Sequence, residues 1–337
     1  MLREAVRRVT TGETLPREQA RQVFTEALDG AVEPALLGAF LAALATRGET
    51  VDEITGAAQA LRAAMLPFPH DRPEAVDTCG TGGDGLGMFN LSTAAAVVAA
   101  AAGAVVVKHG NRAASSRCGS ADLLEAAGLP LELSAQQARV VLEAHGITFL
   151  FAPLYHPALR HAAAVRRALR IRTVFNWLGP LCNPGGVRRQ LLGIGAAARV
   201  ADFARVLAAL GCERAYVVHG AGGADELTLD GANAVHAVGS APPRRFDAAG
   251  LGLKTAPAAA LCGGDAAANV RLLARVLDGG DGPLRDAVLL NAAAALVAAG
   301  VADESADALA RARAAVDSGA ARRKLESWVA CAREVRT

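Results

Sequence analysis

Short runs of β-branched and apolar residues alternate with longer runs rich in alanine and leucine through most of this chain. The β-branched runs predict strands at Ala104–Val107, Ile147–Phe151, Gln190–Ile194 and Ala215–His219. The alanine- and leucine-rich runs predict helices at Thr93–Ala102, Ala121–Ala127, Gln136–Ala144, Arg199–Leu210, Ala266–Leu277 and Leu284–Ala299. Because parallel strands need a crossover connection, usually a helix, this alternation predicts an α/β fold with a mostly parallel sheet covered by helices.

The first seventy residues show no strand pattern and predict helices alone. Thr50 and Glu53 have the spacing of a capping box, in which the hydroxyl and the carboxylate satisfy exposed amides at a helix start. The helix that this box begins is followed by a stiff linker with three prolines, Pro67, Pro69 and Pro73. We therefore predict a small helical domain over 1–72 and a larger α/β domain over 73–337. Helices within 157–186 are expected to pack back onto the helical domain and complete it.

The bulk composition limits the classes of function open to the chain. It has 337 residues, of which 52% are hydrophobic and 20% charged, as expected for a folded chain with a substantial core. Its net charge of +2 argues against a protein that neutralises many nucleic-acid phosphates at once. A small anionic substrate needs only a locally positive pocket, which a near-neutral chain can provide.

The sequence predicts neither membrane insertion nor disulfide bonding. The longest apolar run, Ala94–Val107, is fourteen residues long, whereas a membrane-spanning helix needs about 20. The amphipathic N-terminus is not followed by the apolar core of a signal peptide. The six cysteines are scattered without a C-x-x-C pair, so neither a zinc site nor a disulfide framework is indicated. We therefore expect reduced thiols, a cytoplasmic location and no role at a membrane.

The glycine-rich segment Asp77–Gly85 leads towards the start of a predicted helix. Its Gly80-x-Gly82-x-x-Gly85 spacing formally matches the dinucleotide-binding fingerprint. In that fingerprint, however, the helix opens within the motif and an acidic residue follows about 20 residues later. Here the helix opens only near Ser92–Thr93, and alanine and valine occupy the later region, so a nicotinamide cofactor is not predicted. Two interpretations remain: a phosphate-binding loop with a helix N-terminus, or a tight turn with an ordinary N-cap.

A second polar segment begins where the predicted strand Ala104–Val107 ends. Its candidate ligand-binding residues are Lys108, His109, Gly110, Asn111, Arg112, Ser115, Ser116 and Ser120. Open α/β sheets bind ligands at the edge where their strands end. Two cations, an amide and several hydroxyls in a short span suit a phosphate-rich ligand. A solvated loop is the alternative, but the segment continues two apolar elements without a polar linker.

Two adjacent carboxylates, Asp225 and Glu226, follow the predicted strand Ala215–His219 and a glycine loop. Mg²⁺ prefers oxygen ligands and often bridges protein carboxylates to substrate phosphates, so this pair is a candidate metal site. An acidic pair in a loop is more often plain surface charge. The residues alone leave both possibilities open.

The segment Pro157–Asn183, which follows His156, carries five arginines. The planar fork of arginine matches a carboxylate at two points, so an arginine here is a candidate to bind an acidic substrate. For most of Arg166, Arg167 and Arg170, a solvated helix face is the simpler interpretation. We expect Trp177 to lie in the core rather than under a stacked ligand.

Together and in this order, these segments resemble the anthranilate phosphoribosyltransferase family. Beyond the helical start, the motifs are G-T-G-G-D at 80–84, N-x-S-T at 90–93, K-H-G-N-R at 108–112, R-T-x-F-N-x-L-G-P-L at 172–181 and the acidic pair at 225–226. The resemblance covers nearly the whole chain and implies a nucleoside phosphorylase-like architecture. It also implies transfer of the 5-phosphoribosyl group of phosphoribosyl pyrophosphate to the amine of anthranilate. The products would be N-(5-phosphoribosyl)anthranilate and pyrophosphate, in tryptophan biosynthesis.

The same resemblance implies roles for individual residues. Those implied in binding phosphoribosyl pyrophosphate are Gly80, Gly82, Gly83, Asp84, Asn90, Leu91, Ser92, Thr93, Lys108, His109, Gly110, Asn111, Arg112, Ser115, Ser116 and Ser120. Those implied at the magnesium ions, expected at two per subunit, are Ser92, Asp225 and Glu226. Those implied around anthranilate are Gly80, Asn111 and Arg166, with His109, His156, Gly179 and Pro180 at the mouth of its site.

The expected chemistry needs no general base, because the weakly basic amine of anthranilate already carries its lone pair. Metal and Lys108 would stabilise the leaving pyrophosphate. Family members are typically homodimers joined through the helical domain, with the active site in the hinge between the domains. No nucleic-acid partner is expected.

Three residues depart from the family pattern. Met88 stands where many members have a hydroxyl residue, Ala164 replaces a common proline, and Arg170 occupies a position that is usually glycine. The last two lie on or beside the helix implied in anthranilate binding, so they bear on its affinity more than on the reaction type.

Two other functions are compatible with parts of the pattern. A pyrimidine nucleoside phosphorylase has a similar architecture, but that family has a different glycine loop and a lysine-rich phosphate motif and lacks K-H-G-N-R. A non-catalytic relative that binds nucleic acid is disfavoured by Ser92, Asp225 and Glu226 and by the weak net charge.

Overall fold

The computed structural model describes residues 1–113 and 116–336. Its helices are α1 (Leu2–Thr10), α2 (Arg17–Leu28), α3 (Pro34–Arg47), α4 (Val51–Ala64), α5 (Leu91–Ala101), α6 (Ser120–Ala126), α7 (Ala135–His145), α8 (Ala152–Tyr155), α9 (Arg160–Leu169), α10 (Phe175–Leu178), α11 (Val200–Ala209), α12 (Ala266–Leu277), α13 (Pro283–Ala299), α14 (Ser305–Asp317) and α15 (Ala320–Glu334). Short 3₁₀ helices lie at Pro157–Leu159, Gly179–Leu181, Ala197–Arg199, Ala249–Leu251 and Ala258–Leu261. Its strands are β1 (Val76–Gly80), β2 (Val106–Gly110), β3 (Ile147–Phe151), β4 (Arg189–Gly193), β5 (Arg214–His219) and β6 (Ala234–Gly239).

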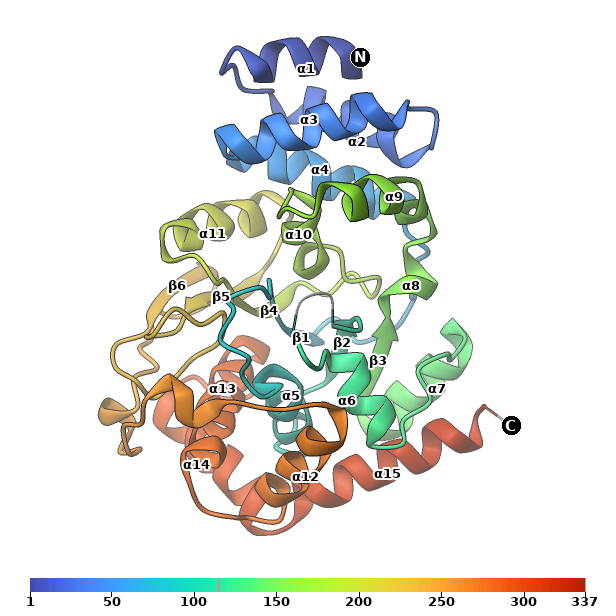
Figure 1. The fold of residues 1–337 in the computed structure, drawn as a ribbon. Helices are drawn as coiled ribbons and strands as arrows, with labels where there is room; N and C mark the ends of the chain where they lie inside the picture. The colour runs from blue at the N-terminus through green and yellow to red at the C-terminus, as the bar shows by residue number, and fades with distance from the viewer. Residues whose placement is uncertain (114–115, 337) are drawn as a thin grey trace.

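Helices α1–α4 form a layered helical unit at one end of the molecule (Figure 1). The predicted capping box begins α4: the Glu53 amide donates to the Thr50 hydroxyl at 3.2 Å, and the Thr50 amide donates to the Glu53 carboxylate at 2.8 Å. Helices α9 and α10, from the arginine-rich segment, pack beneath this unit. The boundary at residue 72, and the assignment of helices within 157–186 to the helical domain, stay predictions.

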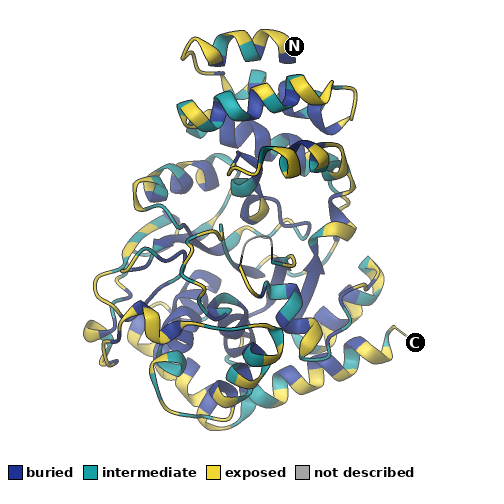
Figure 2. Ribbon diagram, in the orientation of Figure 1, coloured by how far each residue is buried: buried dark blue, intermediate teal, exposed yellow. Residues whose placement is uncertain are grey.

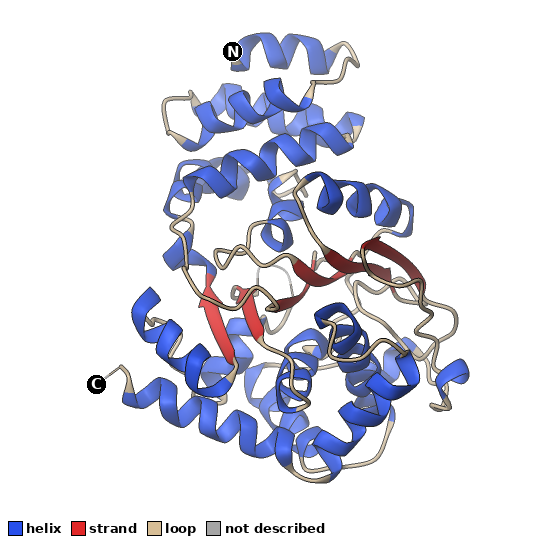
Figure 3. Cartoon of the chain, turned by 180° about the vertical axis from the view of Figure 1, so that it is seen from behind, coloured by secondary structure: helices blue, strands red, loops and turns tan. Residues whose placement is uncertain are grey.

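The strands of the described chain form one sheet in the order β3-β2-β1-β4-β5-β6. All neighbouring pairs are parallel except β5–β6, which is antiparallel. The sheet lies between two layers of helices, as the view from behind shows (Figure 3). The predicted α/β class, a mostly parallel sheet covered by helices, is therefore confirmed.

The two faces of the sheet belong to different apolar clusters, because successive side chains on a strand point to opposite faces. Leu191 packs into the cluster that contains α5, α13 and α14, whereas its neighbour Leu192 packs with α1–α4 and α11. Tyr216 and Val217 on β5 divide in the same way. The helical unit therefore shares one continuous core with a face of the sheet, and its exposed residues lie on the outer helix faces (Figure 2).

Two strands were missed from the sequence, and one was placed too early. The edge strand β6 was missed because most of its side chains are exposed or half-buried, which gives no apolar run. The central strand β1 was missed because it carries Asp77 and Thr78, polar residues that are nevertheless fully buried. Strand β2 includes Lys108 and His109, which we expected to follow the strand rather than form its end.

None of the helices in the described ranges has the length and apolar character needed to cross a membrane.

Candidate active site

The carboxyl ends of β1, β2, β4 and β5 bring the predicted polar segments to one edge of the sheet. The chain leaves β1 into the glycine loop and β2 into the Asn111–Arg112 turn, while the loop after β5 carries Asp225 and Glu226. Strand β1 is central, with β2 on one side and β4 on the other, so the strand order reverses here. Open α/β sheets bind ligands at such a switch point.

The glycine loop has a backbone that only glycine adopts without strain. Gly82 and Gly83 have φ angles of 66° and 74°, in the left-handed region. Among the described residues, the backbone N–H groups of Gly83, Asp84 and Gly85 have no hydrogen-bond acceptor. Consecutive free amides in an exposed turn form a concavity suited to an anion. The structure therefore favours the phosphate-loop interpretation over a simple turn.

Asp225 and Glu226 fasten the glycine loop and the start of α5 to the loop after β5. The Gly82 amide donates to Asp225 Oδ2 at 2.5 Å, and the Ser92 amide donates to Glu226 Oε1 at 2.8 Å. This close approach needs a glycine at 193, because a Cβ there would overlap the Asp225 backbone. The acidic pair is thus buried against the glycine loop and the start of α5 and is not plain surface charge.

Burial and mutual repulsion raise the pKa of both carboxyls. For Asp225 the larger cause is burial, followed by repulsion from Asp84, and for Glu226 it is burial, followed by repulsion from Asp225. A cluster of hard oxygen ligands with too little positive charge nearby fits a divalent cation. In the described part of the chain, no three His, Cys, Asp or Glu side chains form a complete metal cage. The residues thus fit Mg²⁺ held by one or two carboxylates and completed by substrate oxygens.

Helix α5 begins at this cluster. The Asn90 side chain donates to the Cys118 carbonyl at 3.0 Å and accepts from Asn269 at 2.9 Å, which ties the helix start to the loop before α6 and to α12. The Leu91 side chain lies in the core, and the Thr93 hydroxyl is buried without a hydrogen-bond partner. Of the four predicted residues 90–93, Ser92 is therefore the one whose side chain adjoins the acidic pair.

Lys108 supports the site from beneath. Its side chain is only 2% exposed, and its ammonium donates to the Thr78 carbonyl and, at 3.5 Å, to the Ser92 hydroxyl. Burial lowers the pKa of Lys108, and the nearby carboxylate of Asp77 opposes this effect. Asp77 in turn accepts from the Asn183 side chain at 2.8 Å. In this structure Lys108 lends positive charge to the cluster without facing solvent.

The segment after β2 forms a second wall, near α6. The Ser120 hydroxyl donates to the Asn111 carbonyl at 3.4 Å, and a Cβ at Gly110 would overlap this hydroxyl. Arg112 is held by Glu125 through two hydrogen bonds of 2.6 and 2.9 Å. Ser116 is exposed in the same turn. Ser115, also predicted at this site, lies outside the described residues.

A pair of buried histidines joins the end of β2 to the segment after β3. The Nε2 atoms of His109 and His156 are 3.2 Å apart, and His109 Nδ1 lies 3.3 Å from the Gly179 carbonyl. A carbonyl only accepts, so His109 Nδ1 carries the proton and His156 Nε2–H donates to His109 Nε2. Burial lowers the pKa of His109 to about 3, with repulsion from His156 second, and burial lowers that of His156 to about 4. Both rings are therefore neutral near pH 7.

Arg166 is a half-buried cation without an anionic partner. Its guanidinium lies 5.4 Å from the centre of the Phe175 ring, and it makes no ion pair or hydrogen bond within the described chain. Burial lowers its pKa. The neighbouring Arg167 is exposed. Of these two arginines, Arg166 is the one placed to meet a carboxylate.

Four residues that position the site were not identified from the sequence. Arg172 donates to the glycine loop at the Gly82 carbonyl, 2.8 Å away. Asn183 holds Asp77, and Gln190 donates to the Pro180 carbonyl at 2.6 Å. Asn291 on α13 makes two hydrogen bonds to the backbone of Leu227, which follows Glu226. It accepts from the Leu227 amide at 3.1 Å and donates to the Leu227 carbonyl at 2.8 Å. A buried amide inside an apolar run, as at Asn291, is the one sequence signal that could have indicated such a role.

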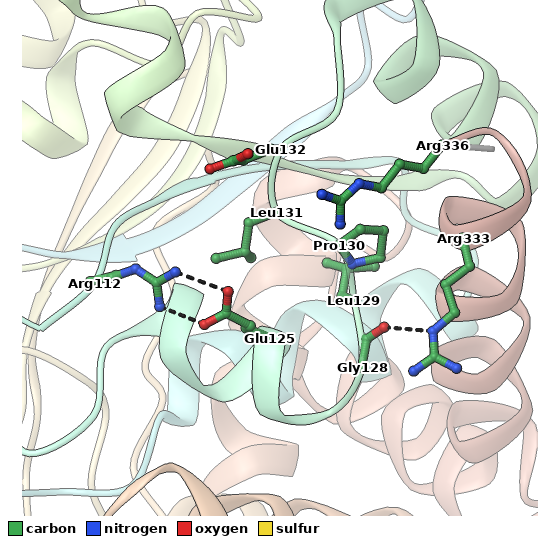
Figure 4. Close-up of a pocket in the computed structure, with 9 residues that line it drawn as sticks. All are labelled: Arg112, Glu125, Gly128, Leu129, Pro130, Leu131, Glu132, Arg333 and Arg336. Atoms are coloured by element: carbon green, nitrogen blue, oxygen red, sulfur yellow. Dashed lines mark hydrogen bonds and ion pairs between the residues drawn. The ribbon is translucent and has the colours of Figure 1, made fainter.

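A surface groove lies away from this cluster. It has a volume of about 580 Å³ and runs between α6, the loop after it and the end of α15 (Figure 4). Arg112 and Glu125 border one side of it, and Arg333 and Arg336 the other. Neither the glycine loop nor the acidic pair lines it, so it is not the centre of the candidate site.

Comparison with known proteins agrees with this architecture and site. Residues 3–65 match the glycosyl transferase family, helical bundle domain, and residues 72–322 match the glycosyl transferase family, a/b domain. The anthranilate phosphoribosyltransferase of Anaeromyxobacter sp. (strain K) is 51% identical over 332 residues, which cover 98% of each chain. That of Roseiflexus sp. (strain RS-1) is 48% identical over 336 residues and also covers 98% of each chain.

Solved structures also match this chain over almost its full length. The crystal structure of anthranilate phosphoribosyltransferase from Thermus thermophilus superposes with a TM-score of 0.91 at 47% identity, covering 98% of this chain and 99% of that one. The enzyme from Saccharomyces cerevisiae, solved in complex with PRPP and Mg, shares the fold at a TM-score of 0.90 and 24% identity, covering 99% and 98%. Sequence identity near one half over almost the full length places this chain in the anthranilate phosphoribosyltransferase family.

Proposed function

We propose that this protein transfers the 5-phosphoribosyl group of phosphoribosyl pyrophosphate to the amine of anthranilate, releasing pyrophosphate. The proposal rests on one observation: backbone amides that can bind an anion lie next to carboxylates that can bind a cation. Three free loop amides at Gly83, Asp84 and Gly85 lie beside the carboxylates Asp225 and Glu226. A donor with a diphosphate and bound Mg²⁺ needs both features together.

The donor would occupy the edge formed by the glycine loop, the start of α5 and the turn after β2. Asp225, Glu226 and the Ser92 hydroxyl would hold Mg²⁺, at two ions per subunit. The metal would supply charge stabilisation to the leaving pyrophosphate. The loop amides would orient the same oxygens, and buried Lys108 would strengthen the positive potential from below.

Anthranilate would lie on the opposite side, towards α9. Arg166 would meet its carboxylate, since a half-buried guanidinium without an anionic partner gains a charge-assisted bond when an acid binds. Gly80 and Asn111 would flank the aromatic ring, and His109, His156, Gly179 and Pro180 would lie at the mouth of the site. The weakly basic amine of anthranilate is unprotonated near neutral pH, so its lone pair would be available for attack on C1 once the amine is positioned.

Fluorescence tests the reaction directly. Anthranilate fluoresces, so its signal should fall with time when the protein, phosphoribosyl pyrophosphate and Mg²⁺ are mixed, and should stay constant with EDTA. No loss of anthranilate, together with phosphorolysis of thymidine, would support the pyrimidine nucleoside phosphorylase alternative instead.

The proposal extends to assembly and location. The family resemblance implies a homodimer joined through the helical unit, which light scattering would report as twice the 34.3 kDa of one chain. The cysteines of the described chain are all unpaired, as expected for a protein of the reducing cytoplasm. A monomer at micromolar concentration would contradict the dimer.

A further inference from the structure

Arg172 joins two parts of the active site that are far apart in sequence. It lies in the short connection between α9 and α10, and its side chain is exposed. Its Nη1 donates to the carbonyls of Gly82 and Gly83 at 2.8 and 3.0 Å. A Cβ at Gly83 would overlap this same nitrogen. The guanidinium is therefore fitted against the bare backbone of the glycine loop.

The two aromatic rings of α10 each contact one arginine. The Arg172 guanidinium lies 4.7 Å from the centre of the Trp177 ring, a typical cation–π distance. The guanidinium of Arg166 lies 5.4 Å from the centre of the Phe175 ring, on the same helix. The start of the helix is held by Asn176, whose side chain accepts from the Thr173 amide at 3.0 Å. One rigid turn thus supports both the acceptor-side arginine and the arginine on the glycine loop.

The glycine loop is pinned from two directions at a single residue. The Gly82 amide donates to Asp225, and its carbonyl accepts from Arg172. Two bonds from opposite ends fix the orientation of the adjoining peptide planes. The free N–H groups of Gly83 and Asp84 share peptide planes with the carbonyls that Arg172 binds. They are thereby held in one arrangement before any anion arrives, which reduces the ordering cost of binding.

We infer that Arg172 is a positioning residue for the donor loop, which it anchors to the connection between α9 and α10. This inference rests on the proposed function, because it assigns the loop to phosphoribosyl pyrophosphate. Arg172 does not need to touch the substrate: it acts by holding the Gly82–Gly83 carbonyls so that the following amides face the anion. Its loss should weaken use of the donor far more than use of anthranilate.

The test compares Arg172→Met and Arg172→Lys with the matched control Arg167→Met, an exposed arginine on α9. Steady-state kinetics with each substrate varied should give Arg172→Met a Michaelis constant for phosphoribosyl pyrophosphate raised about 10-fold. The constant for anthranilate at saturating donor should stay within about two-fold, as for the control. Lysine should rescue only partly, because a point charge cannot bond two carbonyls and stack on Trp177 together.

Hydrogen exchange of the ligand-free proteins tests the contact without any substrate. In Arg172→Met, the hydrogen-bonded amides of Thr81, Gly82 and Leu86 should exchange several-fold faster than in the wild type or in Arg167→Met. Unchanged exchange would overturn the contact itself, and faster exchange with an unchanged donor constant would overturn its positioning role. If the wild type did not use phosphoribosyl pyrophosphate at all, the proposed function would fail while the exchange experiment still decided the contact.

Discussion

Asp225 and Glu226 illustrate a residue-scale conflict between stability and function. Both carboxyls are buried close to Asp84 with little compensating charge, and burial, followed by repulsion within the cluster, raises their pKa. Natural proteins often keep such destabilising groups at sites that must capture a ligand. Here the ligand would be a cation, which would offset the repulsion among the carboxylates.

Neutralising the pair should therefore separate stability from activity. The double variant Asp225→Asn, Glu226→Gln should lose most turnover, because it can no longer capture metal for the leaving group. In EDTA at pH 8, however, its thermal midpoint should rise by about 1–2 °C for a chain of 337 residues, since roughly 1 kcal/mol of burial cost and repulsion is removed. Scanning calorimetry and the anthranilate assay measure the two effects. Near-normal turnover at ordinary Mg²⁺ would exclude the pair as metal ligands.

Arg166 is the residue that should distinguish acceptor binding from donor binding. Arg166→Ala removes a charge-assisted bond to the anthranilate carboxylate and should raise its Michaelis constant about 10- to 150-fold. The donor constant should change little. Arg167→Ala is the control, because that side chain is exposed. If the donor constant rose in both variants, the arginines would serve phosphates, and the proposed acceptor site would be misplaced.

At the scale of elements, the end of α9 carries an unusual backbone. Arg170 is the C-cap of this helix and has a φ of 51°, in the left-handed region, where side chains other than glycine and asparagine are strained. The family pattern usually has glycine at this position. The structure supplies the reason, because a glycine C-cap adopts this conformation freely.

Arg170→Gly should therefore stabilise the protein. Relief of the left-handed strain, about 1–2 kcal/mol, exceeds the extra chain entropy of glycine in the unfolded state, about 0.4–1 kcal/mol. We expect a net gain of roughly 0.5–1 kcal/mol in chemical denaturation, with an unchanged slope. A loss of stability would mean that the Arg170 side chain makes contacts worth more than the strain.

Six helices of the α/β part were predicted to within about two residues because each has an apolar face: α5, α6, α7, α11, α12 and α13. Helices α14 and α15 were not predicted. The strands were harder. Strand β1 escaped detection because its buried Asp77 is compensated by Asn183, more than a hundred residues later, and no local pattern encodes that partnership. The role of Arg172 was not predicted for the same reason. Its acceptors are the carbonyls of two glycines about ninety residues earlier. Because every residue has a backbone carbonyl, the sequence does not indicate which ones accept a hydrogen bond.

At the scale of the whole molecule, the His109–His156 pair joins the sheet to the segment that returns to the helical unit. Both rings are neutral when folded, with pKa values lowered to about 3 and about 4. In the unfolded chain each imidazole takes up a proton near pH 6.5. The unfolded state therefore binds more protons between these limits, and stability falls as the pH drops from about 6.5 towards 4.

Removing one histidine should flatten this dependence. His156→Gln should lower the slope of unfolding free energy against pH by up to about 1.4 kcal/mol per pH unit in that window. Urea titrations at several pH values give the slope. His236→Gln, on the exposed edge strand β6, is the control and should leave it unchanged. An equal slope in wild type and His156→Gln would contradict the neutral buried pair.

The central claim is that anthranilate and a diphosphate donor meet at the carboxyl edge of this sheet. The most direct measurement is a mass balance on the purified protein with anthranilate, phosphoribosyl pyrophosphate and Mg²⁺. We expect one pyrophosphate released for each anthranilate consumed, a product with the mass of phosphoribosylated anthranilate, and neither in EDTA. Pyrophosphate release without a matching loss of anthranilate, or no release at all, would contradict the proposed transfer.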